Sequence, residues 1–416
     1  MALAGKQWIA LVPRAEHRRS QARQPLGQGK RYALENRLGG DIRPITKLEE
    51  CIACPVHFDD DVRAYPERAR QLERRPTLKD VAERAGVSIG TASNAFNRPD
   101  VLSDALRQRV LDEARTLGYG GPDPAGRRLR TGRAGALGLI FTDRLPFAFD
   151  DEAAVIFLRG VASALETTGD GLLLIPTSPT RREGARVVRE SAVDGFLVYS
   201  TPTGDPRLEA ALERGLPTVV VDEPLEVPVP YIGVEDRKGA RDAARHLVEL
   251  GHERVAVVAF PEHALDDHTL PFDATAERLT GYREGLGAAW DPALVFTARG
   301  NRPETGRQGL RELLSVASPP TAVLAMSDAL ASGVLREAAE QHLQVPGELS
   351  VIGFDDVPLA ELTEPPLTTV NQPTEHKGEL AARALLDAIQ TEARSEPRRT
   401  VLPTKLVLRG TTAPPP

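Results

Sequence analysis

The sequence predicts an all-α helix-turn-helix headpiece followed by an α/β body of two doubly wound parallel-sheet subdomains. Two observations carry this expectation. Three short, capped helical segments follow residue 77, and from residue 134 onward apolar runs of strand type alternate with amphipathic helical stretches. Continuous apolar strands separated by helices are typical of parallel sheets covered on both faces. This alternating region of roughly 275 residues exceeds one ordinary core, which predicts two subdomains.

Charge is divided unevenly along the chain. The 416 residues include 52 Lys plus Arg and 59 Asp plus Glu, a formal net charge of −7. Residues 1–76 hold 15 basic and 10 acidic side chains and residues 77–135 hold 10 and 7, so the first third carries +8 and the remainder −15. A basic end on an acidic body indicates that one end meets a polyanion.

Several protein classes are excluded by composition. The chain has no run of about 18 apolar residues for a membrane span, and its first ten residues lack the order of a secretory signal. Its two cysteines, Cys51 and Cys54, fit a reducing cytoplasm and exclude a disulfide scaffold. No second Cys pair follows, which favours two incidental thiols over half of a zinc site. We therefore expect a cytoplasmic protein without a metal or cofactor.

Residues 1–76 form an extension that we expect to be mostly disordered. Its short apolar patches, such as residues 8–12, are separated by Arg, Gln and Gly without helical or strand periodicity. Two interpretations stay open. The segment is either a basic arm that touches DNA or the product of a start site placed too early.

The predicted headpiece covers residues 77–122. Apolar and small residues at helical spacing define three helices, with N-caps at Thr77, Ser88 and Ser103 and ends at Gly86, Asn97 and Gly118. Ala82, Gly86 and Ala92 are small enough to let the first two helices cross closely, as in a helix-turn-helix unit. Packed helices with small residues also occur in ordinary cores, but the Arg-rich segment that follows favours DNA binding.

That segment, residues 123–134, is the predicted hinge helix and linker. Pro124 suits the first turn of a short helix, and Leu129 is its one large apolar residue among four arginines. A helix of this length does not persist alone, so we expect it to form only when something else stabilises it. A solvated linker is the alternative.

The body, residues 135–413, alternates predicted strands and helices. Strands are predicted at 136–142, 171–177, 193–200, 217–222, 254–260, 322–326 and 349–354. Helices are predicted at 152–168, 236–250, 274–287, 304–315, 328–342 and 373–391. The expected division joins 135–235 with 372–398 and 236–371 with 399–413. No dinucleotide or phosphate-binding glycine motif follows a strand, so nucleotide chemistry is unsupported.

Motifs in this order resemble the lactose-repressor (LacI/GalR) family of bacterial transcription regulators over residues 77–413. They include TLKDVAERAGVSIGTASNAFNRPD, RRLRTGR, LVELGHERVAVV, ERLTGYREGL, LAMSDALASGVL, LSVIGFDDVPLAELTEPPLTTVNQP and LPTKLVLRG. The resemblance implies a DNA-binding headpiece and a periplasmic-binding-protein-like body, whose two subdomains enclose a ligand cleft.

The resemblance also implies which residues contact DNA. Ile89, Gly90 and Asn94 would face the major groove, where Asn can pair with adenine and Ile can touch a thymine methyl. Leu129 would be a minor-groove wedge. The further implied contacts, to phosphates or as helix caps, are Thr77, Ser88, Thr91, Ser93, Asn97, Arg127, Arg128 and Arg130.

For the cleft, the resemblance implies a set that suits a polyhydroxylated ligand, because carboxylates accept from hydroxyl groups and a guanidinium donates to their oxygens. The set is Phe147, Phe149, Asp222, Arg278, Ser327, Asp328 and Asp355. Plainer roles remain open: Asp328 as a helix cap and Arg278 in a surface ion pair.

The stretch from Pro261 to Glu277 looks longer than the usual connection and contains His263, Asp266, Asp267 and His268. A metal site is conceivable there, but the histidine spacing favours a mobile cleft loop.

Taken together, the sequence predicts a repressor rather than an enzyme, since no nucleophile–base pair or metal cluster is evident. It would bind a roughly palindromic double-stranded DNA operator as a homodimer and respond to a small-molecule effector, a sugar. A purine-type co-repressor arrangement and a sugar-binding transport component remain as alternatives.

Overall fold

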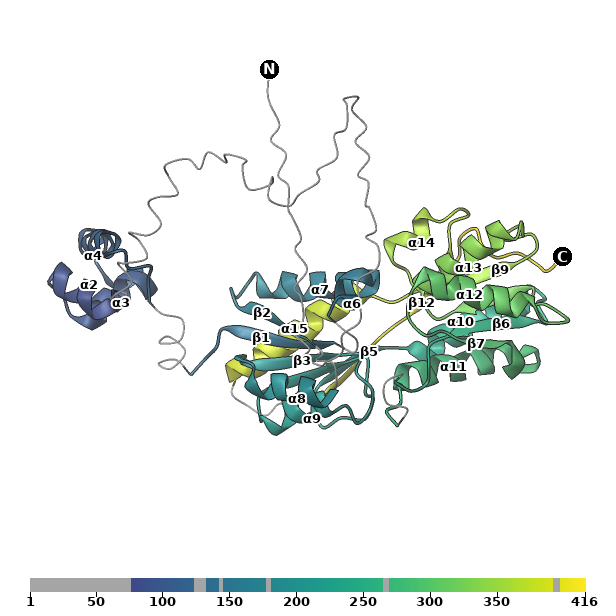
Figure 1. The fold of residues 1–416 in the computed structure, drawn as a ribbon, viewed down its shortest axis with the longest axis horizontal. Coiled ribbons are helices and arrows are strands. Elements are labelled where there is room, and N and C mark those ends of the chain that lie inside the picture. Colours follow the sequence, from purple (N-terminus) through teal and green to yellow (C-terminus); the bar gives the residue numbers. More distant parts are fainter. Residues whose placement is uncertain (1–75, 123–131, 142–144, 177–180, 265–268, 392–396) are drawn as a thin grey trace, which may run out of the picture. The chain divides into compact units, whose positions relative to one another are not determined.

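The computed structural model describes residues 76–122, 132–141, 145–176, 181–264, 269–391 and 397–416 (Figure 1). Several predicted features lie outside these residues. They are the extension 1–75 with Cys51 and Cys54, the hinge residues Arg127, Arg128, Leu129 and Arg130, and the loop residues Asp266, Asp267 and His268.

Three helices form the headpiece: α2 (Leu78–Ala85), α3 (Ile89–Asn97) and α4 (Asp104–Leu117). The predicted N-caps are confirmed, because Thr77, Ser88 and Ser103 each accept a backbone N–H of the first turn that follows. Gly86 and Gly118 end their helices with φ of 63° and 68°, a conformation that favours glycine. Small buried side chains, including Ala92 at 0% exposure, pack at the centre.

The first sheet of the body has the strand order β11-β5-β4-β3-β1-β2, and all its pairs are parallel. Its strands are β1 (Ala136–Phe141), β2 (Gly171–Ile175), β3 (Gly195–Tyr199), β4 (Thr218–Val221), β5 (Tyr231–Val234) and β11 (Arg399–Leu402). Helices α7 (Glu152–Leu165) and α15 (Thr374–Thr391) cover one face, and α8 (Arg181–Glu190) and α9 (Pro206–Glu213) cover the other (Figure 1). We call this sheet with its helices the first lobe.

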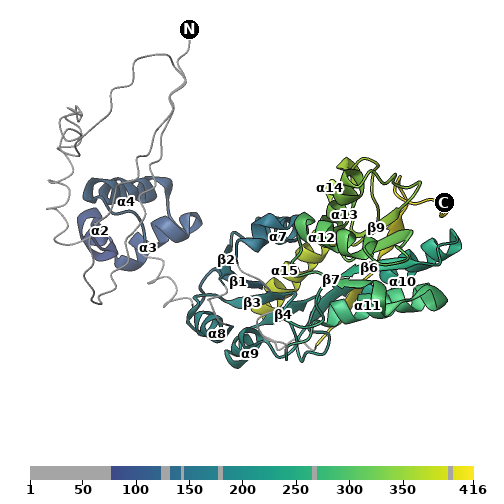
Figure 2. The same ribbon diagram turned by 45° about the vertical axis from the view of Figure 1, so that its right-hand side comes forward.

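The second sheet has the order β12-β10-β9-β8-β6-β7 and is parallel except for the β10–β12 pair. Its strands are β6 (Val255–Ala259), β7 (Val295–Thr297), β8 (Ala322–Ala325), β9 (Ser350–Asp355), β10 (Thr368–Asn371) and β12 (Lys405–Val407). Helices α10 (Asp236–Glu249) and α11 (Asp273–Leu286) cover one face, and α12 (Pro303–Leu314) and α13 (Asp328–Glu340) cover the other (Figure 2). These elements make the second lobe.

The chain passes between the lobes after β5, after β10 and after β11. Strand β11 pairs with β5, and this corrects the expected division at residue 399, which would separate the two strands. The last passage of the chain from the first lobe to the second lies after Leu402, because β11 is completed in the first sheet before the chain enters the second sheet. Among the described helices, none combines the length and apolar composition needed to cross a membrane.

Candidate functional site

The exposed start of α3 carries the residues predicted to read DNA. The Ser88 hydroxyl oxygen accepts from the Thr91 backbone N–H at 3.0 Å, which holds the first turn in place. Ile89 follows with 52% of its surface exposed, although a large apolar side chain is ordinarily buried. Gly90 beside it is exposed and adds no side chain. At this end of α3, one exposed apolar side chain therefore lies beside a stretch of backbone that no side chain covers.

Some of the other polar residues predicted to contact DNA are already hydrogen-bonded within the headpiece, and others are not. The Asn97 amide donates to the Ser93 carbonyl at 3.0 Å and to its hydroxyl at 3.2 Å, so it is held within the helix. Thr77 is engaged in a capping box with Asp80 at the start of α2. Asn94 is half-buried, and its side chain has no hydrogen-bond partner within the described part of the chain. Its amide is thus available to an external partner.

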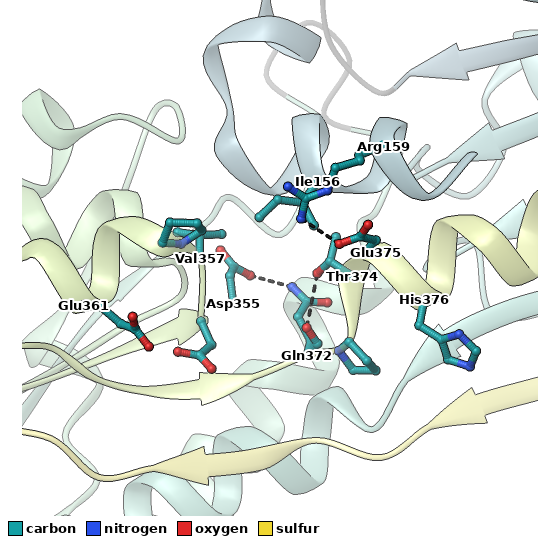
Figure 3. A pocket seen from close by; sticks show the side chains of 12 residues that line it. Ile156, Arg159, Asp355, Val357, Glu361, Gln372, Thr374, Glu375 and His376 are labelled. Carbon is teal, nitrogen blue, oxygen red and sulfur yellow. Dashed lines mark hydrogen bonds and ion pairs between the residues drawn. The ribbon is translucent and has the colours of Figure 1, made fainter. Parts of the chain in front are cut away.

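In the body, a chain of buried side chains connects the two lobes. Lys377, on α15, donates to both Asp222 carboxylate oxygens at 2.8 and 2.7 Å and to the Gln372 side-chain oxygen at 3.0 Å. The Gln372 amide in turn donates to Asp355 at 2.5 Å (Figure 3). Asp222 follows β4 of the first lobe and Asp355 ends β9 of the second. The structure therefore joins two predicted effector residues through two that were not predicted.

Arg278 lies on α11 and is buried rather than part of a surface ion pair. Its Nε donates to Asp236 at 2.7 Å and its Nη1 donates to the Met326 carbonyl at 2.8 Å. The guanidinium also lies 3.7 Å from the centre of the Phe354 ring, a cation–π contact. We call Asp222, Asp236, Arg278, Asp355, Gln372 and Lys377 the polar cluster.

Ser327 and Asp328 have local partners. Ser327 is the N-cap of α13, and its hydroxyl also donates to Asn301 at 2.5 Å. Asp328, which is fully buried, accepts from the Val357 backbone N–H at 3.0 Å and from the Thr369 hydroxyl. The helix cap is therefore Ser327, while Asp328 ties the ends of β8 and β9 to β10.

The two predicted phenylalanines lie in α6 (Phe147–Asp150). Phe149 is 60% exposed, so its ring is not enclosed by the described residues. The helix leads to Asp151, which accepts from the Asn301 amide at 3.3 Å and so connects the first lobe to the loop before α12. Burial raises the pKa of Asp151 to about 6.

Carboxyl groups outnumber cations around the polar cluster. Burial and the mutual repulsion of these carboxyl groups raise the pKa of several of them. Burial raises the pKa of Asp355 well above its ordinary value, and Asp328 and Asp151 add to the rise while Arg278 opposes it. Burial likewise raises the pKa of Asp328 to about 7 and that of Glu223 to about 8. At neutral pH the site thus contains carboxyl groups that retain protons.

The cluster borders a cavity of about 460 Å³, within the range of small-molecule sites (Figure 3). Asp355 and Gln372 line it together with Ile156 of α7 and Pro358 of α14 (Pro358–Leu362). Arg159 and Glu375, also in its lining, form an ion pair at 2.6 Å.

Sequence reasoning missed five residues of this region: Asp151, Asp236, Asn301, Gln372 and Lys377. One signal was available for Lys377, because it shares the helical spacing of the buried residues Ala381 and Leu385. A lysine on the apolar stripe of a helix is rarely buried without a partner. Gln372 follows β10, a strand that was not predicted, so its position at a strand end was hidden.

Comparison with known proteins identifies both parts of the chain. Residues 77–121 match the family described as bacterial regulatory proteins, lacI family, and residues 244–412 match a periplasmic binding protein-like domain. An HTH-type transcriptional regulator of Mycolicibacterium smegmatis is 38% identical over 382 residues, covering 84% of this chain and 99% of its own. The HTH-type transcriptional regulator CelR of Thermobifida fusca is 37% identical over 355 residues, covering 82% and 99%.

Solved structures give the same result. A complex of the transcriptional regulator CelR with cellobiose aligns with a TM-score of 0.61 and 34% identity, covering 81% of this chain and 100% of its own. The lac repressor dimer bound to operator and the anti-inducer ONPF aligns with a TM-score of 0.68 and 26% identity, covering 82% and 100%.

Proposed function

The chain belongs to the lacI family of bacterial regulatory proteins and is a DNA-binding transcriptional regulator rather than an enzyme; on that premise we propose that it is a repressor controlled by a sugar. It binds a roughly palindromic operator as a homodimer. In this proposal residues 77–122 read DNA, residues 123–134 form the hinge, and residues 135–413 bind the effector and dimerise.

The polar cluster is the single observation that carries the effector part of the proposal. It places Asp222 and Asp355 at the carboxyl ends of strands in different sheets, with Arg278 between buried partners. In open parallel sheets ligands bind outside the carboxyl ends of strands. Carboxylates and a guanidinium suit hydroxyl groups, and the CelR relative is known in complex with cellobiose.

On DNA, Ile89 and Asn94 supply the base contacts and Gly90 lets the backbone approach. Ser88, Thr91, Ser93, Asn97 and Thr77 position the headpiece, and the hinge residues Arg127, Arg128, Leu129 and Arg130 act in the minor groove and at phosphates. The sugar favours one arrangement of the two lobes, and that arrangement governs whether the paired hinges can form. Effector and operator must then change each other's affinity by the same factor.

The test is selection of bound DNA from a random pool by the full-length protein, with and without a panel of sugars and nucleobases. We expect enrichment of a palindromic site, and loss of that enrichment with one of the sugars. If a DNA site is enriched only when a nucleobase is present, the protein is a repressor that needs a co-repressor rather than one that a sugar releases from DNA. Absence of any enriched site would refute sequence-specific DNA binding.

A further inference from the structure

The ammonium group of Lys377 is neutralised within the polar cluster. Its side chain is 1% exposed, and its three contacts are two Asp222 oxygens and the Gln372 oxygen. An ammonium group has three N–H donors. All three are therefore used, so Lys377 has neither a free charge nor a free donor for a ligand.

Arg278, the other cation of the cluster, is neutralised by Asp236 at 2.7 Å. The Phe354 ring covers one face of the guanidinium, and the Met326 carbonyl takes one further N–H. A guanidinium has five N–H donors. Arg278 can therefore still donate to a ligand oxygen although its charge is already balanced.

Two carboxyl groups at the same place accept their hydrogen bonds from neutral amides rather than from cations. Asp355 accepts from Gln372, and Asp151 accepts from Asn301. Burial raises the pKa of both groups, and Arg278 opposes the rise at Asp355 without cancelling it.

An unpartnered hydroxyl lies at the same edge of the first sheet. Thr201 is fully buried, and among the described residues its hydroxyl has no hydrogen-bond partner. It follows β3, the neighbour of β4, so it lies in the row of strand ends that includes Asp222. A buried hydroxyl without a partner is unfavourable, and a ligand hydroxyl can satisfy it without introducing charge.

We propose that the site binds an uncharged polyhydroxylated molecule and discriminates against its phosphorylated and carboxylated forms. An anion would meet Asp355 and Asp151, and the two buried cations of the polar cluster are already paired with Asp222 and Asp236. Hydroxyl groups, by contrast, can use the free donors of Arg278 and can bind to protonated or ionised carboxyl groups alike. This inference rests on the proposed function, because it concerns the effector of the same site.

The experiment measures the affinity of matched compounds for the full-length protein by calorimetry, together with their effect on binding to the selected operator. The sets are glucose and glucose 6-phosphate; ribose and ribose 5-phosphate; cellobiose and cellobionate. For the scaffold that binds, we expect the anionic form to be at least about 100-fold weaker than the neutral form. An anionic form that binds as tightly as the neutral one would overturn the inference.

A variant tests the cause of the discrimination. Asp151→Asn retains an acceptor for Asn301 but removes one carboxyl group, so the ratio of anionic to neutral Kd should fall by about 10-fold. Asp150→Asn, at an exposed neighbouring position, should leave the ratio unchanged. An unchanged ratio in Asp151→Asn would also contradict the inference, and a folding defect alone would weaken both forms equally.

The two proposals fail differently. If a phosphorylated sugar binds and releases the operator, the effector-controlled repressor stands and only the charge selectivity is wrong. If the protein binds its operator and no compound of any set binds or alters operator affinity, the assignment of a sugar to the polar cluster fails, and the charge inference fails with it.

Discussion

At the scale of single residues, the body depends on buried charges that are paired one to one. Lys377 and Asp222 are both buried, as are Arg278 and Asp236. Replacing such a pair by apolar residues is often tolerated, whereas removing one partner leaves a charge without compensation in a poorly solvated place. The sequence contains each of these residues, but only their pairing in the folded protein explains why charged side chains are tolerated in the interior.

Lys377→Met should destabilise the protein by about 3 to 5 kcal/mol, because Asp222 then remains buried without its cation. The measurement is the free energy of urea unfolding. Lys238→Met is the matched control: Lys238 pairs with Asp242 on an exposed face of α10, so its loss should change stability by less than about 1 kcal/mol. Equal effects in both variants would mean that the buried pair has no special role.

Asn94→Ala should reduce discrimination between the selected operator and random DNA by about 1 to 3 kcal/mol, because the bidentate contact to adenine that we propose for Asn94 would be lost. The measurement is the affinity for both DNAs at two salt concentrations. Gln108→Ala, on the exposed surface of α4, should leave the discrimination intact. A parallel loss on both DNAs would instead indicate that Asn94 contacts phosphate.

At the scale of elements, the connection before α11 fastens the lobes together. The Thr203 backbone N–H donates to the Pro271 carbonyl at 3.0 Å, and Asp273 accepts from the Thr203 hydroxyl and the Leu225 N–H, both at 2.9 Å. Pro271 and Asp273 belong to the connection that the sequence marked as unusually long. The described part of this connection thus contributes contacts between the lobes. Within it, His263 forms a β-bridge with Pro271.

Asp273→Ala should weaken this attachment, because the Thr203 hydroxyl and the Leu225 N–H lose their acceptor. We expect faster hydrogen exchange at the Leu225 amide and a loss of about 1 to 3 kcal/mol in stability. The comparison variant is Glu304→Ala, which removes an exposed acidic residue from the first turn of α12. Exchange at Leu225 that is equally slow in all three proteins would show that Asp273 does not hold the lobes.

The predicted elements are largely confirmed. The seven predicted strands match β1, β2, β3, β4, β6, β8 and β9, and the six predicted helices match α7, α10, α11, α12, α13 and α15. The missed strands β5, β7, β10, β11 and β12 have only three or four residues each. Such runs are too short for a periodicity signal, and their neighbours in the sheet stabilise them. Helices α6, α8, α9 and α14 were also missed; α8 is rich in arginine, so its apolar stripe is narrow.

At the scale of the whole molecule, stability should depend on pH through the buried carboxyl groups. The pKa of Glu223 is raised to about 8, mainly by burial, with Asp222, Asp236 and Asp273 adding to the rise and the Ala274 N–H opposing it. A carboxyl group whose pKa is raised by folding binds its proton more tightly in the folded state. Its stabilising effect is complete below the ordinary pKa and is lost as pH rises through about 8.

We therefore expect the Tm of the full-length protein to fall between pH 5 and pH 8.5, with part of the fall due to Glu223. In Glu223→Gln this contribution disappears, so the Tm curve should be flatter over the same interval. Glu226→Gln supplies the comparison, since Glu226 lies on the same connection after β4 and should retain the native slope. A native slope in Glu223→Gln would show that another group controls the dependence.

The sequence by itself determined the family, the helix caps of the headpiece and most of the long elements. Those features depend on neighbouring residues, through caps, periodicity and motifs that stand in one order along the chain. Tertiary structure alone decided that β11 belongs to the first sheet and that Lys377 and Gln372 join Asp222 to Asp355. Asp222 and Lys377 are separated by 155 positions, and pairing over such distances follows from packing two sheets together, which no local pattern records.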